Sequence, residues 1–288
     1  MSLASKPAME RITNFVTNWN IISYPGSAWA KQVFPDLEER DAISSLAKAI
    51  FSISRVDNPD PIAAWEKHQQ TLTSRQNWLN EKNFSALRYS APGTDLTIGL
   101  AKGHEWKGGA STSKNGITCT PNIPTEEVFT TPHSHRVDGC VKATKPLVYR
   151  GTLIEGIEVE FEKGKITKAR AEKGEEVFLN LLDTDEGARR LGEVALVPHS
   201  SPISESGLLF YNTLYDENAS CHIALGQCYS KCFRDDIGDD PEKVSEAGGN
   251  TSNIHVDWMI GSDRMDIDGV SQDGTITPVM RNGEWAYN

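Results

Sequence analysis

One short stretch, NIHVDWMIG at residues 253–261, decides how the chain is interpreted. Its composition is that of a β-strand, in which successive side chains point to opposite faces. His255 and Asp257 then lie on one face, and Val256 and Trp258 lie on the other. An imidazole beside a carboxylate is typical of metal ligands, although a surface hydrogen bond next to a buried strand explains the pair as well. The stretch therefore predicts a strand with one core face and one polar face.

Two other segments place one residue of a metal-ligand type in an apolar run. CHIALG (221–226) contains His222, and RLGEVALV (190–197) contains Glu193. A carboxylate at the head of an apolar strand costs free energy unless it is solvated, paired or bound to a metal. Each residue alone also has an ordinary explanation, as a satisfied core histidine and as a solvated glutamate at a strand end.

A fourth segment, PTEEVFTTP (124–132), contains the adjacent residues Glu126 and Glu127. Adjacent side chains of an extended chain face opposite ways, so one of the two can face a site while the other faces solvent. The spacing does not say which one does so. An ordinary acidic turn after Pro124 is the alternative.

Outside these segments, the predicted secondary structure changes from helical to β-rich near Ala91-Pro92-Gly93. Before that point, helical spacing predicts one helix opened by Pro35-Asp36 and another opened by Asp60-Pro61. After it, short β-rich runs separated by Gly, Asn and Pro predict a curled sheet or a small barrel. The acidic, glycine-bearing segment 234–253 is expected to be a mobile loop.

The composition excludes several classes of protein. The 288 residues include 29 Lys and Arg and 40 Asp and Glu, and the formal net charge of −11 argues against a nucleic-acid binder. The uncharged segment Ile12–Ala30 contains Asn14, Asn18, Asn20 and Pro25, so it is too polar to span a membrane. The N-terminus lacks the apolar core of a signal peptide. Five cysteines without such a signal predict free thiols and a cytoplasmic location.

Together these segments match a known family. NIPTEEVFT, RLGEVALVP, LYDENASCHIALG and NIHVDWMIGS resemble the thermophilic aminopeptidases, also called M29 metallopeptidases. YPGSAWA, DPIAAWEKH, GTDLTIGL and the ending IDGVSQDG…NGEWA extend the resemblance over nearly the whole chain from about Trp19. The match is specific because the motifs are long and stand in the family's order.

The resemblance implies a set of metal ligands and an active-site tyrosine. The ligands would be Glu127, Glu193, His222, His255 and Asp257. The resemblance thus selects Glu127 over Glu126, and it places the tyrosine at Tyr229, for which core packing is the alternative. Five mixed ligands exceed one tetrahedral site and suit two divalent ions roughly 3.5–4 Å apart, bridged by a carboxylate.

The general base should be a carboxylate that is not fully used by the metals. Glu126 and Glu217 are candidates only because they lie next to the motifs. Tyr229 would hydrogen-bond the developing oxyanion.

The implied function is that of a metalloaminopeptidase, a hydrolase that uses water activated by two metals to release N-terminal residues from peptides. Zinc, cobalt, magnesium or manganese would serve as the ions, peptides with a free N-terminus would be the substrates, and the resemblance implies a homodimer. The expected fold is mixed α/β (α+β), with a helical N-terminal part, a β-rich, barrel-like middle and a metal-binding α/β C-terminal part. The expected division is residues 1–92, helical, and 93–288, β-rich and catalytic.

Two alternatives remain open. Family members carry an additional N-terminal α/β domain before the segment that begins here near Trp19, so this chain could be a truncated, catalytically incomplete metal- or peptide-binding protein. The other alternative is a mononuclear metal hydrolase acting on a non-peptide amide. The number of bound ions separates this second alternative from a two-metal enzyme.

Overall fold

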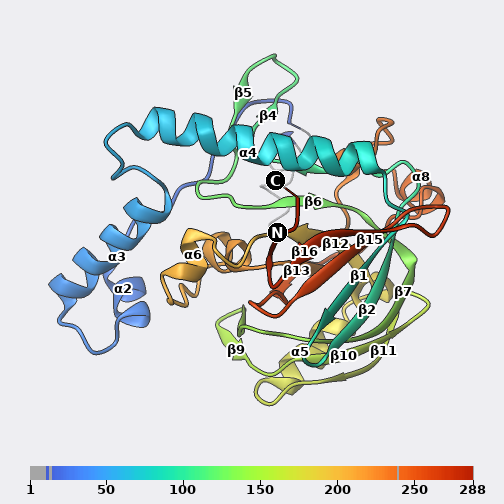
Figure 1. The fold of residues 1–288 in the computed structure, drawn as a ribbon. Helices are drawn as coiled ribbons and strands as arrows, with labels where there is room; N and C mark the ends of the chain where they lie inside the picture. The colour runs from blue at the N-terminus through green and yellow to red at the C-terminus, as the bar shows by residue number, and fades with distance from the viewer. Residues whose placement is uncertain (1–10, 13–14, 239, 288) are drawn as a thin grey trace.

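The computed structural model describes residues 11–12, 15–238 and 240–287. Residues 1–10, where the sequence lacks a signal-peptide pattern, lie outside this part of the chain. Two antiparallel sheets form the body of the molecule (Figure 1). The predicted mixed α/β class is therefore confirmed, and the larger sheet is open rather than closed into a barrel.

The larger sheet has eight strands in the order β11-β10-β7-β2-β1-β15-β16-β17. In chain order they are β1 (Ala86–Ala91), β2 (Thr94–Leu100), β7 (Pro132–Lys142), β10 (Glu158–Glu162), β11 (Lys165–Arg170), β15 (Asp266–Val270), β16 (Ile276–Arg281) and β17 (Glu284–Trp285). Strand β1 pairs with both β2 and β15. The predicted division after residue 92 thus falls in the turn of the β1–β2 hairpin, and as a boundary between folding units it stays a prediction.

The smaller sheet has five strands in the order β14-β13-β12-β6-β3. They are β3 (Lys107–Gly108), β6 (Val128–Thr130), β12 (Leu191–Leu196), β13 (His222–Gly226) and β14 (His255–Met259). Two short hairpins, β4 (Ser111–Thr112) with β5 (Thr118–Cys119) and β8 (Leu147–Tyr149) with β9 (Thr152–Ile154), stand apart from both sheets.

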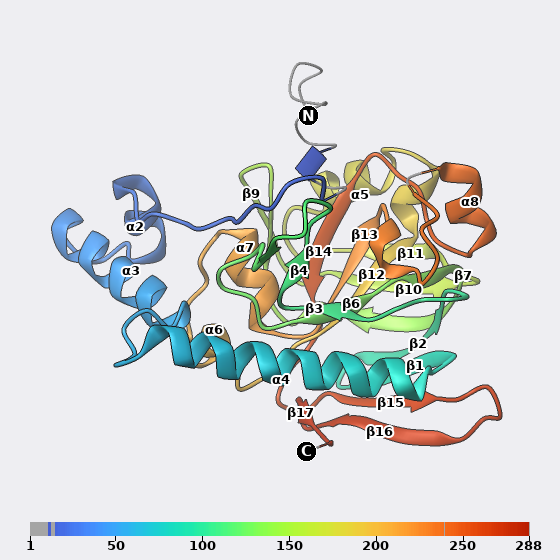
Figure 2. The same ribbon diagram turned by 90° about the horizontal axis from the view of Figure 1, so that it is seen from above.

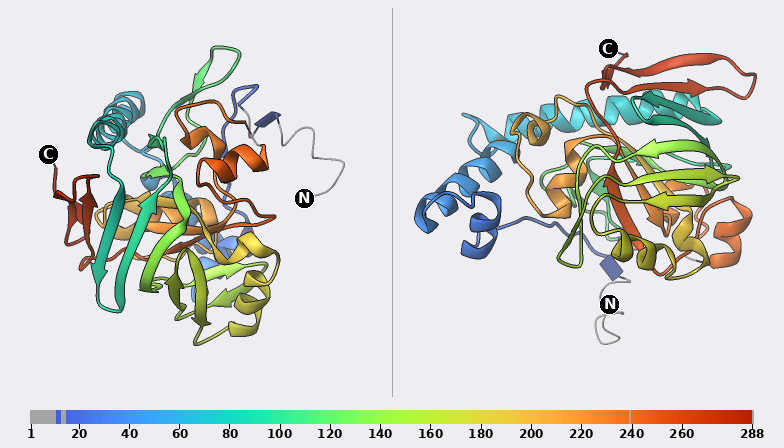
Figure 3. Two further views of the ribbon diagram at one scale, coloured as in Figure 1. Left: turned by 90° about the vertical axis from the view of Figure 1, so that its right-hand side faces the viewer. Right: turned by 90° about the horizontal axis from the view of Figure 1, so that it is seen from below.

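One hydrophobic core lies between the two sheets (Figure 3). Alternate residues of the smaller sheet contribute to it, including Val194, Ile223, Val256 and Trp258, all of them buried. Because neighbouring side chains of a strand face opposite ways, the residues between these positions lie on the other face of the small sheet. The predicted alternation in residues 255–258 is confirmed.

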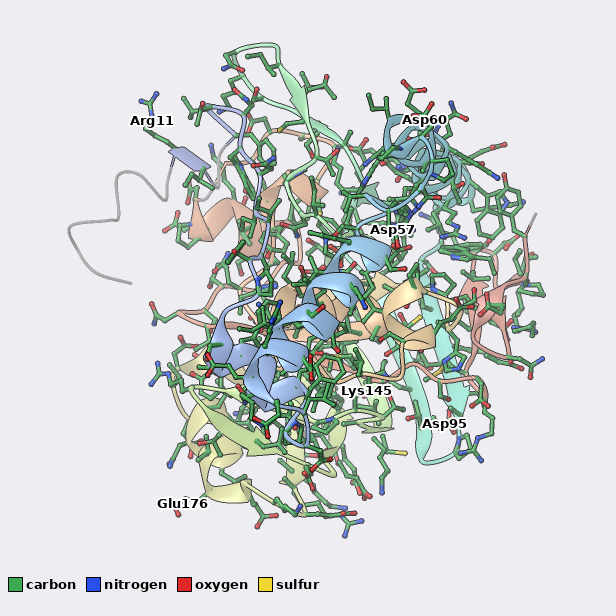
Figure 4. All side chains as sticks on the ribbon, turned by 90° about the vertical axis from the view of Figure 1, so that its left-hand side faces the viewer. Arg11, Asp57, Asp60, Asp95, Lys145 and Glu176 are labelled. Atoms are coloured by element: carbon green, nitrogen blue, oxygen red, sulfur yellow. The ribbon has the colours of Figure 1, made fainter. Side chains whose placement is uncertain are left out.

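The helical N-terminal part consists of α2 (Ser27–Val33), α3 (Glu39–Ile53) and α4 (Pro61–Lys82). The Asp60 side chain accepts a hydrogen bond from the Ala63 amide, and Pro61 occupies the first turn, so the predicted start of α4 is confirmed. Helix α4 runs beside β3 and β6, whereas α2 and α3 project from the body (Figure 2). In Figure 4, Asp57 and Asp60 mark the turn that joins α3 to α4.

The remaining helices are short. They are α5 (Glu175–Leu182), α6 (Pro202–Glu205), α7 (Thr213–Asp216) and α8 (Pro241–Glu246), with 3₁₀ turns η2 (Glu186–Arg189), η3 (Glu217–Ala219) and η4 (Ser230–Cys232). The expectation of a loop throughout 234–253 was wrong, because α8 lies within it and its Val244 packs against Cys228 and Phe233. Within the described ranges, no helix has both the length and the apolar character needed to cross a bilayer.

Candidate metal centre

The face of the small sheet that points away from the shared core carries the ligand-type residues. Strand register sets Asp257 beside Ala224 and Ala224 beside Glu193, and it sets His222 beside Ala195. Residues directly opposite one another on paired strands share a face. Ala224 therefore stands between Glu193 and Asp257, and all four ligand-type residues of the three strands share this face.

The structure brings together all five residues that the resemblance selects. Single ligand atoms of Glu127, Glu193 and His222 lie within 4.8 Å of one another, and so do those of Glu193, His255 and Asp257. His222 Nε2 is 3.1 Å from Glu127 Oε2, and His255 Nε2 is 3.2 Å from Glu193 Oε2 and 3.4 Å from Asp257 Oδ1. Two three-residue groups thus meet at one shared carboxylate, that of Glu193.

Backbone carbonyls orient both histidine rings. His222 Nδ1 lies 3.2 Å from the carbonyl oxygen of Ser220, and His255 Nδ1 lies 2.7 Å from that of Gln227. A carbonyl only accepts hydrogen bonds, so both Nδ1 atoms carry the proton and both Nε2 atoms face the carboxylates. This second hydrogen bond is the usual partner of a metal-binding histidine.

A fourth carboxylate, Glu217, also faces the group. Burial raises its pKa well above the usual value, and the charges of Asp257 and Glu127 raise it further. Glu217 lies outside both three-residue groups. The sequence indicates Glu217 only because it lies next to the motifs, and its proximity to the other carboxylates depends on the tertiary fold.

The charges of this cluster fit two divalent cations. Glu127, Glu193, Glu217 and Asp257 are four carboxylates, and among the described residues no lysine or arginine forms an ion pair with them. Two protonated imidazoles would neutralise only half of that charge. Two divalent cations would balance all four carboxylates while both imidazoles stay neutral, the form in which imidazole binds metals. The donor set therefore fits the implied ions.

Tyr229 borders the cluster just before η4. Its ring centroid is 4.7 Å from that of His255, and the Phe129 ring packs against it in an edge-on contact at 5.8 Å. Burial raises the pKa of Tyr229 well above the usual value, and the charge of Glu193 raises it further. The phenol therefore keeps its proton at neutral pH and is available as a hydrogen-bond donor.

Glu126 points away from the cluster. Its Oε1 forms an ion pair with Arg55 Nη1 at 2.7 Å, and its Oε2 lies 3.8 Å from His68 Nε2. The structure thus separates the two adjacent glutamates that the sequence left undecided. Of the two candidate bases, the geometry favours Glu217, because an arginine already neutralises Glu126.

We expect metal binding to this site to release protons and to strengthen as pH rises. Burial works to lower the pKa of His222, but its hydrogen bond to Glu127 and the surrounding carboxylates raise it to about 10. An incoming cation must displace this proton, so the apparent affinity should increase about tenfold per pH unit for each proton released. Titration calorimetry with cobalt between about pH 6 and about pH 8, in buffers of different ionisation enthalpy, measures the release. A pH-independent affinity with no proton release would contradict this electrostatic description.

Comparison with known proteins gives one consistent family. A family model described as thermophilic metalloprotease (M29) matches residues 1–285. Aminopeptidase T of Thermus thermophilus is 55% identical over 282 residues, which cover 98% of this chain and 69% of that protein. Aminopeptidase 2 of Geobacillus stearothermophilus is 48% identical over 294 residues, covering 100% of this chain and 71% of that protein.

Solved structures agree with the sequence comparison. The structure of wild-type AmpT from Thermus thermophilus superposes with a TM-score of 0.92 at 53% identity, covering 99% of this chain and 69% of that one. A 2,5-dihydroxypyridine dioxygenase from Pseudomonas putida superposes with a TM-score of 0.55 at 11% identity, over 99% of this chain and 76% of that one. The second likeness shows a shared fold alone.

Proposed function

Because the chain belongs to the M29 family of thermophilic metalloproteases, whose model matches residues 1–285, we propose that it is a metal-dependent aminopeptidase that releases N-terminal residues from peptides. The observation that carries the proposal is the meeting of two ligand groups at Glu193. A structural metal site needs one closed set of ligands, whereas two groups joined by a carboxylate are typical of hydrolases with two metals.

Glu127, Glu193 and His222 would hold one ion, and Glu193, His255 and Asp257 would hold the other. When bound, such a pair activates water and polarises the scissile carbonyl. Zinc, cobalt, magnesium or manganese suits these ligands, because carboxylates and imidazoles accept several divalent ions. The His222 side chain is 1% exposed and the His255 side chain is 20% exposed, so the substrate would approach from the His255 end.

Glu217 is proposed to accept a proton from the attacking water and to pass it to the leaving amine. A catalytic carboxylate needs a raised pKa and a place beside the reacting atoms. The burial of Glu217 next to the carboxylates of Asp257, Glu127 and Glu193 supports both. The Asn218 side-chain amide lies 3.5 Å from Glu217 Oε1 and helps to orient the carboxylate.

Tyr229 is proposed to donate a hydrogen bond to the oxyanion that develops on the scissile carbonyl. Replacing Tyr229 by phenylalanine removes this donor and keeps the ring, so kcat should fall about 10²- to 10³-fold. KM and the number of bound ions should change little. Steady-state kinetics and metal analysis check this, with Tyr149→Phe as the control, a tyrosine at the end of β8 that belongs to neither ligand group. An unchanged kcat would assign Tyr229 to packing only.

The function is tested with one peptide in two forms, with a free and with an acetylated N-terminus. With zinc or cobalt present, mass spectrometry should show stepwise loss of the first residue from the free form only, and EDTA should stop it. When bound, one of the ions would also hold the free α-amine of the substrate, and acetylation removes this amine. Cleavage of both forms would contradict aminopeptidase action, and cleavage of neither, with ions bound, would favour the incomplete metal- or peptide-binding alternative.

We propose that the protein acts on peptides in the cytoplasm as a homodimer. Neither nucleic acids nor membranes are proposed as partners. The net charge of −11 supports the lack of nucleic-acid partners, and the five free cysteines support the cytoplasm. Light scattering measures the assembly directly, and a monomer at working concentration would contradict the dimer.

A further inference from the structure

A buried network joins the helical N-terminal part to the segment that carries Glu127. Arg55 follows the end of α3 with a φ of +62°, and its Nη1 forms the 2.7 Å ion pair with Glu126. Its Nη2 lies 3.2 Å from Nδ1 of His68, a residue of α4. The His68 Nε2 lies 2.7 Å from the carbonyl oxygen of Thr125.

The hydrogen bonds of this network determine the tautomer and the protonation state of the His68 ring. The Thr125 carbonyl only accepts, so His68 Nε2 donates, and Nδ1 accepts from Arg55. Burial lowers the pKa of His68, which fits this neutral form. The positive charge of Arg55 is therefore paired with the Glu126 carboxylate, and each ring nitrogen of His68 has its own hydrogen-bond partner.

The backbone of the same segment also forms a hydrogen bond with Asn218, the residue after Glu217. The Glu126 amide donates to Asn218 Oδ1 at 2.7 Å, and the Asn218 side-chain amide donates to the Leu214 carbonyl at 3.1 Å. Asn218 is fully buried and directly follows Glu217. The chain at residues 125–127 is thus held between α3 and α4 on one side and η3 on the other.

We propose that Arg55, His68 and Glu126 are positioning residues that fix Glu127, so that the α3–α4 helices determine how tightly the Glu127–Glu193–His222 group binds its ion. This inference rests on the proposed two-metal function. Glu126 and Glu127 are adjacent and point in opposite directions, so the orientation of one side chain constrains the other. Losing Arg55 would leave the Glu126 carboxylate buried without its arginine partner, which destabilises the present arrangement of the segment that carries Glu127.

The test is metal binding to folded variants, measured by equilibrium dialysis with zinc. In Arg55→Met we expect the ion held by Glu127 to bind about 10- to 100-fold more weakly, while the ion on the His255 side binds as in the parent. Glu126→Gln, which removes the charge and keeps the shape, should weaken the same ion less. If Arg55→Met does not fold, Glu126→Gln carries the test. The matched control is Arg189→Met, which breaks an exposed arginine–aspartate ion pair of the same 2.7 Å length.

A combined variant identifies which ion responds. Glu127→Ala should lose the ion of its group, and adding Arg55→Met to it should then change the remaining affinity no further, because both changes act on the same ion. Equal weakening of both ions in Arg55→Met, or affinities equal to the parent in both Arg55→Met and Glu126→Gln, would overturn the inference. A parent protein that binds no zinc would instead contradict the proposed function.

Discussion

Replacing Glu193 by alanine is expected to remove both metal ions and to abolish peptidase activity, the largest effect of any single change in this chain. Glu193 is the one residue common to both ligand groups. Its removal takes one ligand from each ion. Without the ions, the carboxylates of Glu127, Glu217 and Asp257 lose the positive charge that would balance them. A metal pair at this site would supply several kcal/mol of catalysis, so activity should fall by about 10³-fold or more.

Metal analysis of the dialysed variant measures this directly. Glu127→Ala and Asp257→Ala serve as comparisons, because each belongs to one group only and should lose one ion. Glu176→Gln, on the exposed surface of α5, is the neutral control (Figure 4). If Glu193→Ala bound two ions as the parent does, the ligand assignment would be wrong.

Replacing Glu217 by glutamine is expected to give the second-largest effect, a fall in kcat of about 10²- to 10⁴-fold. The amide has the shape of the carboxylate and accepts no proton from water. Both ions should stay bound, because Glu217 stands outside the two ligand groups. The acidic limb of the pH–rate profile should also disappear, since that limb reports the protonation of the base.

Kinetics and metal content of the same preparation distinguish the roles of Glu217. Glu205→Gln, an exposed residue at the end of α6, is the matched control. Loss of an ion from Glu217→Gln would make Glu217 a ligand, and a kcat close to that of the parent would leave it without a role in proton transfer.

Local patterns predicted the strand that carries His255 and Asp257, because alternation along one strand is a property of the sequence alone. The start of α4 at Asp60-Pro61 was predicted for the same reason, since the cap is local. Helix α5 was missed because EEVFLNLL is a short apolar run that periodicity does not assign to helix or strand.

The centre of the site could not be derived from local patterns. Glu193 meets His255 only because β12 and β14 both pair with β13, and such pairings join distant parts of the chain. The choice between Glu126 and Glu127 likewise needed Arg55, which lies far before them in the sequence. His68 fits a helical apolar face and suggests core packing, and only its contact with Thr125 shows a link to the site.

The central claim is that two ions sit side by side and share Glu193. Anomalous diffraction from zinc-loaded crystals tests it most directly. The structure predicts two peaks, one among Glu127, Glu193 and His222 and the other among Glu193, His255 and Asp257. A single fully occupied peak in crystals of active protein, or peaks that leave Glu193 uncoordinated, would contradict it.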